Sequence, residues 1–346
     1  MARVGGSRLD ITPFSERLRP APRRGGFRRE GWWVWGGSPI RGEDGRWHLF
    51  ASCWPKRYPF FEGYIAYSRV VRAVSDTAEG PYRYVEEVLP PRGPEYWDGR
   101  MTHNPTIRRY GSRYLLFYIG ATHDEPDPAA EALRADSPPV CRKAYRNVRI
   151  GLAIADSITG PWRRADRPAL EPRPKKWDGT IVTNPAPVVL EDGRILLYYR
   201  SNTPRGLRIG AAVADGPEAG FARISDDPVL ELPGGNFVED PFVWRVNGHY
   251  EMVAKDMTGG ITGEKHAGVH AVSADALNWE LAPRPKAWSR TVRWEDGTAT
   301  TLGSLERPQL LLDGTGKPTH LFAAAADGPG GFRNAANTWT LVIPLE

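Results

Sequence analysis

Three carboxylates and three cations in this sequence each stand where a short apolar stretch begins or ends. They are Glu239, Asp240, Glu306, Arg200, Lys255 and Arg307. Two carboxyl groups in different environments can act as a general acid and a general base, because one holds a proton while the other stays ionised. The cations could bind a carboxylate, sulfate or phosphate group, or they could pair with those carboxylates. Whether these side chains meet depends on the elements that carry them.

Those elements follow an internal repeat. Five segments share a polar residue, a proline, a short apolar stretch, a turn with glycine and an aromatic-rich stretch. They start at Ser38-Pro39, Asn104-Pro105, Asn184-Pro185, Asp240-Pro241 and Arg307-Pro308. Each segment predicts a β-hairpin, because turns such as Asn247-Gly248 supply the positive-φ positions that tight connections need.

A second hairpin motif follows each of the first four segments, as in Ala153-Ile154-Ala155-Asp156 with Gly160-Pro161-Trp162. Two hairpins per repeat make a four-stranded antiparallel sheet, which is a propeller blade. We therefore predict an all-β fold, a single five-bladed β-propeller domain over residues 1–346 with blades beginning near residues 33, 102, 182, 238 and 305. The fifth repeat lacks its outermost strand, and Arg8 to Phe14 is predicted to supply it and close the ring. Residues 122–147 are predicted to form a long loop with one helical turn inside blade two.

Composition narrows the classes of function. The net charge is +5, and the 46 Lys and Arg residues are scattered along the chain, so no nucleic-acid partner is predicted. The two cysteines, Cys53 and Cys141, have no CxxC spacing, which argues against a zinc ribbon or a disulfide framework. No apolar leader or membrane span stands out, which predicts a cytoplasmic protein with no membrane partner. The oligomeric state stays open.

The propeller topology brings distant residues together. First strands start, and second strands end, at the same face of each blade, because the two strands are antiparallel. The candidate site residues at this face are Ser38, Trp54, His103, Asn104, Asn184, Arg200, Glu239, Asp240, Lys255, Asp256, Glu306 and Arg307. They should form one rim of acids, bases and aromatic rings at the mouth of the central channel.

The repeated strand starts, the Asp…Gly-Pro-Trp motif and Glu239-Asp240-Pro241 resemble the five-bladed propeller glycoside hydrolases, the group that includes families 43, 32 and 117. The resemblance spans about the whole chain. It implies hydrolysis of an oligosaccharide from its non-reducing end, with inversion, and with Glu239 as the general acid. Asp240 or Glu306 would serve as base or modulator, and the other rim residues would bind the carbohydrate. No metal-ligating residue is predicted, and a Ca²⁺ ion in the channel is left open.

Blade one departs from the family pattern. The related enzymes present an Asp before the first strand as the base, whereas this chain has Gly37-Ser38-Pro39 there. A substitute base would come from Glu306, Asp240, Asp98 or Asp178. The last two lie in a repeated Trp-Asp-Gly phrase, and repetition favours an architectural role, because a catalytic group is needed only once.

Two other functions stay open. The three cations could hold phosphate, which would make the protein a glycoside phosphorylase, and they would also suit an anionic sugar. Alternatively, the missing Asp of blade one could mean that the propeller binds carbohydrate without cleaving it.

Overall fold

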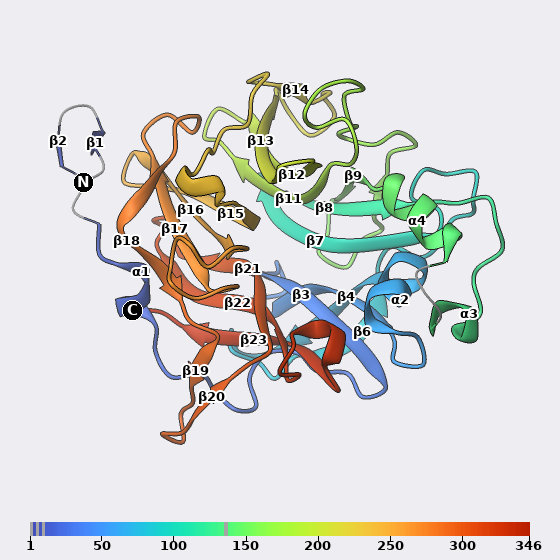
Figure 1. The fold of residues 1–346 in the computed structure, drawn as a ribbon, viewed down its shortest axis with the longest axis horizontal. Coiled ribbons are helices and arrows are strands. Elements are labelled where there is room, and N and C mark those ends of the chain that lie inside the picture. The colour runs from blue at the N-terminus through green and yellow to red at the C-terminus, as the bar shows by residue number, and fades with distance from the viewer. Residues whose placement is uncertain (1–2, 5–6, 9–10, 135–137) are drawn as a thin grey trace.

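The computed structural model describes residues 3–4, 7–8, 11–134 and 138–346. Five antiparallel sheets surround a central channel in chain order, as the colours of Figure 1 show. The all-β five-bladed propeller expected from the repeats is therefore confirmed. Four blades have four strands each, and the fifth has three.

Each blade pairs its strands in sequence order from the channel outwards. Blade one holds β3 (Trp32–Arg41), β4 (Trp47–Pro55), β5 (Arg69–Ser75) and β6 (Arg83–Glu87). Blade two holds β7 (Met101–Tyr110), β8 (Arg113–Ala121), β9 (Arg149–Ala155) and β10 (Arg163–Arg164). Blade three holds β11 (Thr183–Val189), β12 (Ile195–Thr203), β13 (Gly206–Ala214) and β14 (Ala222–Arg223).

Blade four holds β15 (Val238–Val246), β16 (His249–Asp256), β17 (Gly268–Ser273) and β18 (Glu280–Trp288). Blade five holds β21 (Ser304–Leu312), β22 (Pro318–Ala326) and β23 (Thr338–Pro344). Two small hairpins stand apart, β1 (Arg3–Val4) with β2 (Ser7–Arg8), and β19 (Thr291–Arg293) with β20 (Ala299–Thr301). The core lies between facing blades. Leu115 and Phe117 of blade two, for example, join Leu197 and Tyr199 of blade three in one buried cluster.

All five first strands carry a β-bulge at the same place. The pairing register shifts after Trp35, His103, Thr183, Glu239 and Glu306. The next residue in each strand has a left-handed backbone, with φ of 70° at Gly36, 52° at Asn104, 54° at Asn184, 58° at Asp240 and 54° at Arg307. A bulge re-aims the side chains beside it, and non-glycine residues with positive φ are uncommon outside Asn and Asp. The repeated bulge therefore marks the channel mouth as a built feature.

The register corrects the alignment of blade one. The sequence pattern equated Ser38-Pro39 with Asn104-Pro105, but the left-handed position of blade one is Gly36, two residues earlier. Ser38 pairs with Phe50 just as Thr106 pairs with Phe117, so Ser38 lies one layer deeper in the channel. The sequence pattern failed because Gly36-Gly37 carries no polar side chain to mark the bulge.

The predicted closing strand Arg8 to Phe14 is not confirmed. Arg8 belongs to the β1–β2 hairpin, residues 9–10 lie outside the described residues, and Phe14 begins the helix α1 (Phe14–Arg17). Isolated bridges instead join Leu18 to Leu345 and Phe27 to Thr340, beside the outer strand β23. Figure 1 shows this N-terminal segment running past α1 next to the last blade.

Insertions after second strands reach the same face as the channel mouth. Helix α2 (Phe60–Tyr67) follows β4, and the 3₁₀ turn η2 (Phe332–Asn334) follows β22. The predicted loop 122–147 contains two helices, α3 (Ala130–Arg134) and α4 (Pro139–Arg146), and residues 135–137 between them lie outside the described residues. One further 3₁₀ turn, η1 (Pro233–Gly235), precedes β15. Within the described ranges, no helix is long and apolar enough to cross a membrane.

The Trp-Asp-Gly phrases attach the loop that precedes a blade to that blade. Asp98 is fully buried, and its carboxylate accepts bonds from Arg92 Nε at 2.7 Å and from the Tyr118 hydroxyl at 2.7 Å. Asp178 repeats this arrangement with Arg173 Nε at 2.9 Å and the Tyr199 hydroxyl at 2.8 Å. Neither carboxylate lines the channel-mouth cavity, which fits the architectural role expected for them.

Candidate active site

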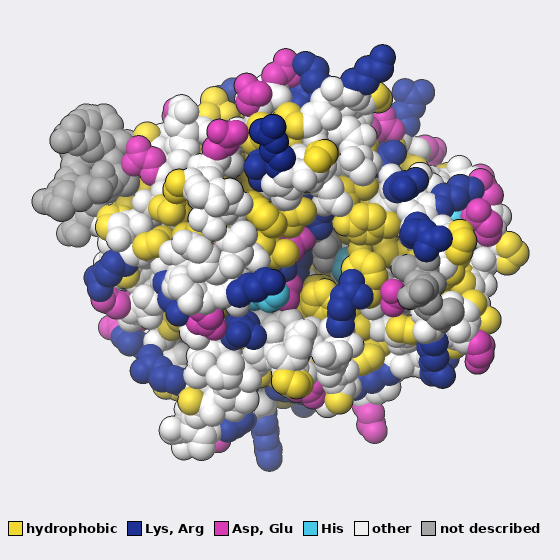
Figure 2. Space-filling view, viewed as in Figure 1, with side chains coloured by type: hydrophobic (Ala, Val, Ile, Leu, Met, Phe, Trp, Pro, Cys, Tyr) yellow, Lys and Arg dark blue, Asp and Glu magenta, His cyan; other side chains and the backbone are white. Residues whose placement is uncertain are grey.

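The face at which first strands start is hollowed at its centre, and Figure 2 shows acidic side chains at the bottom of this hollow. The cavity has a volume of about 120 Å³. Its polar lining comes from the bulged strand starts and from the ends of second strands, and its apolar lining comes largely from the insertions. The sequence-predicted residues that line it are His103, Asn104, Asn184, Arg200, Glu239, Asp240, Lys255, Glu306 and Arg307.

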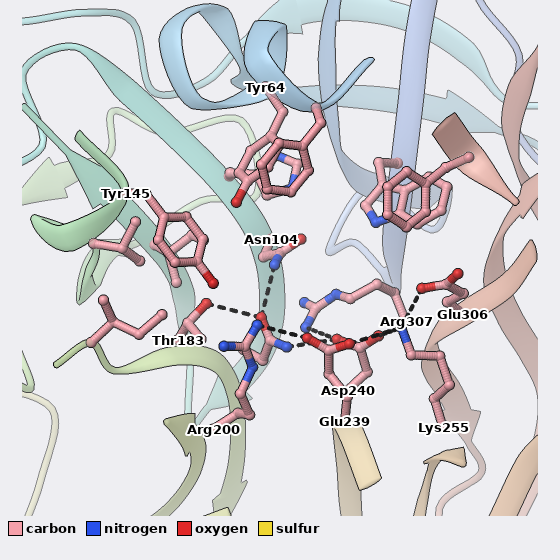
Figure 3. Close-up of a pocket in the computed structure, with 18 of the residues that line it drawn as sticks. Tyr64, Asn104, Tyr145, Thr183, Arg200, Glu239, Asp240, Lys255, Glu306 and Arg307 are labelled. Atoms are coloured by element: carbon pink, nitrogen blue, oxygen red, sulfur yellow. Dashed lines mark hydrogen bonds and ion pairs between the residues drawn. The ribbon is translucent and has the colours of Figure 1, made fainter. Parts of the chain in front are cut away.

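Three carboxylates meet around one lysine, an arrangement called here the carboxylate cluster (Figure 3). Lys255 Nζ lies 2.8 Å from Glu239 Oε2 and 3.6 Å from Asp240 Oδ2, and it also donates to Glu306. The Lys255 side chain is only 5% exposed. Its three N–H donors thus face three acids, which is why an ammonium can be buried here.

Arginines complete the charge balance of the carboxylate cluster. Arg200 Nη2 donates to Glu239 Oε1 at 2.6 Å, and Arg307 Nη1 lies 3.3 Å from Asp240 Oδ1. Together with Lys255, these arginines give three cations for three acids. The cations are therefore paired rather than free to bind an anion.

The left-handed residues form a hydrogen-bonded chain across the blades, called here the channel-mouth ring. Asn104 Nδ2 donates to Asn184 Oδ1 at 3.0 Å, and Asn184 Nδ2 donates to Asp240 Oδ1 at 2.6 Å. Arg307 reaches the same Asp240 oxygen from blade five. The ring therefore runs through blades two, three, four and five, and its place in blade one is Gly36, which has no side chain.

The surroundings of Glu239 and Asp240 shift the pKa values of these two acids in opposite directions. Burial alone would raise the pKa of Glu239, but the charges of Lys255 and Arg200 outweigh burial and hold that pKa below its usual range. For Asp240, burial raises the pKa, and the negative charge of Glu239 adds to this against the opposing effect of Lys255. Asp240 is thus the acid that takes a proton more readily. Asp240 Oδ1 already accepts from Asn184 and Arg307, so Oδ2 is the oxygen for that proton.

Aromatic side chains wall the cavity on the side of blades one and five. Trp35 packs edge-on against Phe60 of α2 and Phe332 of η2, with ring centroids 4.9 and 5.5 Å apart. Tyr64 lies against His103, with centroids 4.7 Å apart. Figure 3 shows the hydroxyl groups of Tyr64 and Tyr145 turned into the cavity. These groups add sites that could bind ligand hydroxyls.

His103 is buried and neutral. Its Nδ1 lies 2.7 Å from Ser68 Oγ. Burial, reinforced by the nearby charge of Arg307, holds the pKa of His103 well below its ordinary value. A neutral imidazole of this kind suits hydrogen bonding to a ligand better than proton donation.

Three predicted site residues do not line the cavity. Ser38 Oγ donates to Gln309 Oε1 at 3.0 Å and accepts from the Ile107 amide at 3.1 Å, deeper in the channel. Trp54 is fully buried beneath Phe60, with ring centroids 4.9 Å apart. It therefore supports α2 and does not face a ligand.

Asp256 is the third. It is fully buried at the end of β16 and accepts backbone N–H bonds, from Gly259 at 2.8 Å and Thr262 at 3.0 Å among others. These bonds outweigh burial and lower the pKa of Asp256. The carboxylate therefore shapes the loop after β16 rather than the cavity.

The lining residues that sequence reasoning missed come largely from insertions and from strand approaches. They are Phe60, Phe61, Tyr64, Ile119, Tyr145, Val148, Ile181, Thr183 and Phe332. The position of an insertion could have indicated some of these residues, because any insertion after a second strand starts at the channel mouth. The aromatic run Tyr58-Pro59-Phe60-Phe61 directly after β4 satisfied that rule.

The residues present do not fit a Ca²⁺ ion in the channel. Across the described ranges, no group of three or more His, Cys, Asp or Glu side chains is placed to hold a metal. The first strand β7 also places the buried guanidinium of Arg108 over the Phe242 ring, 4.6 Å from its centroid. Asp240 is already shared among Lys255, Arg307 and Asn184. A further cation at Asp240 would have to compete with the cations that this carboxylate already pairs with.

Comparison with solved structures places the fold. Zg3597, a family 117 glycoside hydrolase from the marine bacterium Zobellia galactanivorans, matches with a TM-score of 0.64 at 16% identity, over 95% of this chain and 89% of that one. The catalytic domain of a Coprinopsis cinerea GH62 α-L-arabinofuranosidase matches with a TM-score of 0.65 at 13% identity, over 96% and 98% of the two chains. A thermostable family-43 glycoside hydrolase gives 0.60 at 15% identity, over 92% of each chain.

These similarities confirm the expected resemblance at the level of the fold. At sequence identities this low, they show a shared fold alone. No protein-family model matches the sequence, and no curated protein matches it either.

Proposed function

We propose that this protein is a glycoside hydrolase that removes a terminal sugar from an oligosaccharide. The observation that carries the proposal is the carboxylate cluster, in which neighbouring acids have oppositely shifted pKa values inside a partly apolar cavity. Acid and base roles require such a split. The fold shared with solved glycoside hydrolases supports the same chemistry by analogy.

The shape of the cavity supports action at a chain end. Below the channel-mouth ring, Gln309 is hydrogen-bonded to both Ser38 and Thr106, and these three buried side chains occupy the channel. Above it, α2 and η2 wall the cavity. A small cavity with a filled floor accommodates one terminal sugar better than the middle of a long chain.

The electrostatics favour Asp240 as the proton donor and Glu239 as the ionised group. This exchanges the role that the family resemblance implies for Glu239. Lys255 and Arg200 keep Glu239 ionised, so it would serve as a nucleophile or as a stabiliser of the positive charge that develops on the sugar. Glu306 shares Lys255 and would tune both acids.

The same arrangement favours retention of configuration over the inversion implied by the resemblance. Inverting enzymes hold their carboxyl groups about 6.5–9.5 Å apart, on opposite faces of the sugar, whereas retaining enzymes hold theirs about 5–5.5 Å apart. All three cavity-lining carboxylates come from blades four and five and face one lysine. NMR of the first-formed anomer tests this, with retention as the expected result.

A leaving-group experiment tests the assignment of roles. Glycosides of neutral pentoses and hexoses with a 4-nitrophenyl or a 2,4-dinitrophenyl leaving group would be offered to the wild type, E239Q, D240N and E306Q. D240N should lose about 10²–10⁴ in rate on the 4-nitrophenyl substrate but release dinitrophenol in a burst, because that leaving group needs no proton. E239Q should lose both activities. A burst in E239Q instead would return the acid role to Glu239, and full turnover in both E239Q and E306Q would reject the assignment.

One alternative has a specific observation in its favour. Gly36 leaves blade one without the acid that related enzymes carry there, which would suit a propeller that binds carbohydrate without cleaving it. Sugar binding that is unchanged in E239Q, with no turnover over the glycoside panel, would establish that alternative. A phosphorylase is less supported, because Arg200, Lys255 and Arg307 are all paired with carboxylates. Adding inorganic phosphate should therefore leave the rate unchanged, and a neutral sugar is the expected substrate.

A further inference from the structure

We propose that the vacant place of the channel-mouth ring, at Gly36, is filled by a hydroxyl group of the bound sugar. The inference rests on the proposed function only in taking a carbohydrate as the ligand. It assigns a specific contact to blade one, which otherwise contributes only aromatic side chains to the cavity.

The equivalence of Gly36 with the ring residues is geometric. Gly36 follows the register shift of β3 just as Asn104 follows that of β7 and Arg307 that of β21. Its φ of 70° lies in the same left-handed region as theirs. A side chain at Gly36 would therefore point as the ring side chains do, towards the channel mouth.

Gly36 faces open space although it is buried. A Cβ built on Gly36 would meet no atom within 4 Å, whereas a Cβ on the next residue, Gly37, would lie 2.5 Å from the Thr340 side chain. The space therefore belongs to the ring position and not to loose packing of the whole strand. It lies beside Trp35, which lines the cavity.

The ring neighbours of Gly36 offer one acceptor and one donor. Asp240 Oδ1 accepts from Asn184, so Asn184 turns its oxygen to Asn104, and Asn104 must donate to it. This fixed direction leaves Asn104 Oδ1 without a partner among the described residues, and Figure 3 shows this oxygen on the side of the amide away from the hydrogen bond that Asn104 donates. On the other side, Arg307 Nε also has no partner within the described part of the chain.

A hydroxyl group matches these two neighbours. It can donate to Asn104 Oδ1 and accept from Arg307 Nε, whereas a carboxylate could only accept and an ammonium could only donate. Buried donors and acceptors that lack partners are costly, so a ligand that supplies both bonds gains affinity and selectivity.

The test is to fill the place with a side chain of the protein. Asn at position 36 can adopt the left-handed backbone, as Asn104 and Asn184 do at the equivalent positions. The matched control is Gly45→Asn, in the turn between β3 and β4 at the far end of blade one, where φ is 78° and a Cβ also meets nothing within 4 Å. Gly36→Ala adds only a methyl group and serves as a second variant.

Calorimetry would measure binding of L-arabinose, D-xylose, D-galactose, L-fucose and L-rhamnose, and then of the monodeoxy forms of each sugar that binds. G36N should weaken binding of the parent sugar at least about tenfold, while G45N leaves it unchanged and both variants melt at the same temperature. One deoxy sugar should bind the wild type about tenfold more weakly and show no further loss in G36N. G36A should bind more weakly than wild type but stay sensitive to that deoxy position.

The outcomes separate this inference from the proposed function. Sugar binding that is equal in the wild type, G36N and G36A would overturn the inference and leave glycoside hydrolysis untouched. The inference also fails if the losses from G36N and from every deoxy position simply add. If none of the sugars binds to the wild type, both the inference and the proposed neutral sugar substrate are rejected.

Discussion

The ammonium group of Lys255 is almost wholly buried, and three carboxylates surround it. Removing one partner from a buried ion network leaves the others unpaired, which typically costs about 3–5 kcal/mol. We therefore expect Lys255→Met, which keeps the length of the side chain, to lower the free energy of unfolding by about that amount. Urea unfolding measures it. Lys286→Met removes a half-exposed lysine that pairs with Glu264, and this control should change stability little.

The loss of stability in the Lys255→Met variant should depend on pH. In the wild type, the pKa of Glu239 is lower than in the unfolded chain, so its ionised form stabilises the fold at neutral pH and loses this effect only in strong acid. Asp240 has the opposite shift, so its ionisation opposes folding as the pH rises above its unfolded value. Without Lys255, burial acts on both acids unopposed by its charge. The gap in melting temperature between wild type and variant should widen from pH 5 to pH 8, and a gap that narrows would contradict the network.

For single residues, the sequence predicted a position in the site wherever a polar side chain stands at the bulge itself. Glu239, Asp240 and Arg307 could be assigned to the channel mouth, because strand ends of each repeat must meet at one face. Ser38 was misplaced because the bulge of blade one lies at two glycines, and a shift of two residues leaves no polar trace. The partners of Asp256 are backbone amides of the following loop, and a loop conformation cannot be read from residue types.

At the scale of elements, the Trp-Asp-Gly phrases show why a repeated motif signals architecture. Trp97 stacks on Tyr118, and Trp177 stacks on Tyr199, with nearly equal centroid distances of 5.7 and 5.9 Å. In each phrase the buried Asp joins the loop that precedes a blade to the second strand of that blade. The repetition of this phrase could be recognised from sequence. Its architectural role follows from the need of a buried carboxylate for hydrogen-bond partners.

Asp98→Asn should therefore destabilise the protein without touching the site. Asp98 is fully buried and pairs with Arg92 and Arg164, so an amide in its place removes the buried counter-charge of both arginines, at a cost of about 3–5 kcal/mol. Thermal unfolding would show the loss, while kcat and KM at a temperature well below the transition stay at wild-type values. Asp166→Asn is the matched control, because Asp166 also pairs with Arg92 but is 80% exposed. Equal losses in the two variants would contradict this account.

The insertions were the least predictable elements. Helix α2 has no side-chain cap at its N-terminus, and its Phe60 packs on Trp54 of the preceding strand and on Phe332 of the distant η2. Tertiary packing of this kind decides a short helix more than its propensity does. The sequence could thus indicate that residues after β4 reach the site, but not the form they take there.

At the scale of the whole molecule, the ring must join blade five to blade one. The five blades and their order follow from the repeats, but the predicted closing strand does not appear as a continuous strand. The chain instead contacts both blades through Phe27, whose backbone pairs with Thr340 of β23 and with Tyr82 of blade one. Its side chain packs with Val34, Phe322 and Val342.

Phe27→Ala should show how much this junction, the contacts of Phe27 with blades one and five, contributes to stability. Phe27 is 1% exposed, and truncating a buried Phe to Ala typically costs about 3–5 kcal/mol through lost burial and the cavity that remains. Because the junction joins the two ends of the ring, opening it should loosen blades one and five first, and amide hydrogen exchange should rise earliest in β3 and β23. Val85→Ala on the exposed edge strand β6, 46% exposed, serves as the control and should leave both quantities unchanged. Exchange that rises equally in all five blades would mean that the propeller opens as one unit and that Phe27 has no special part in closing it.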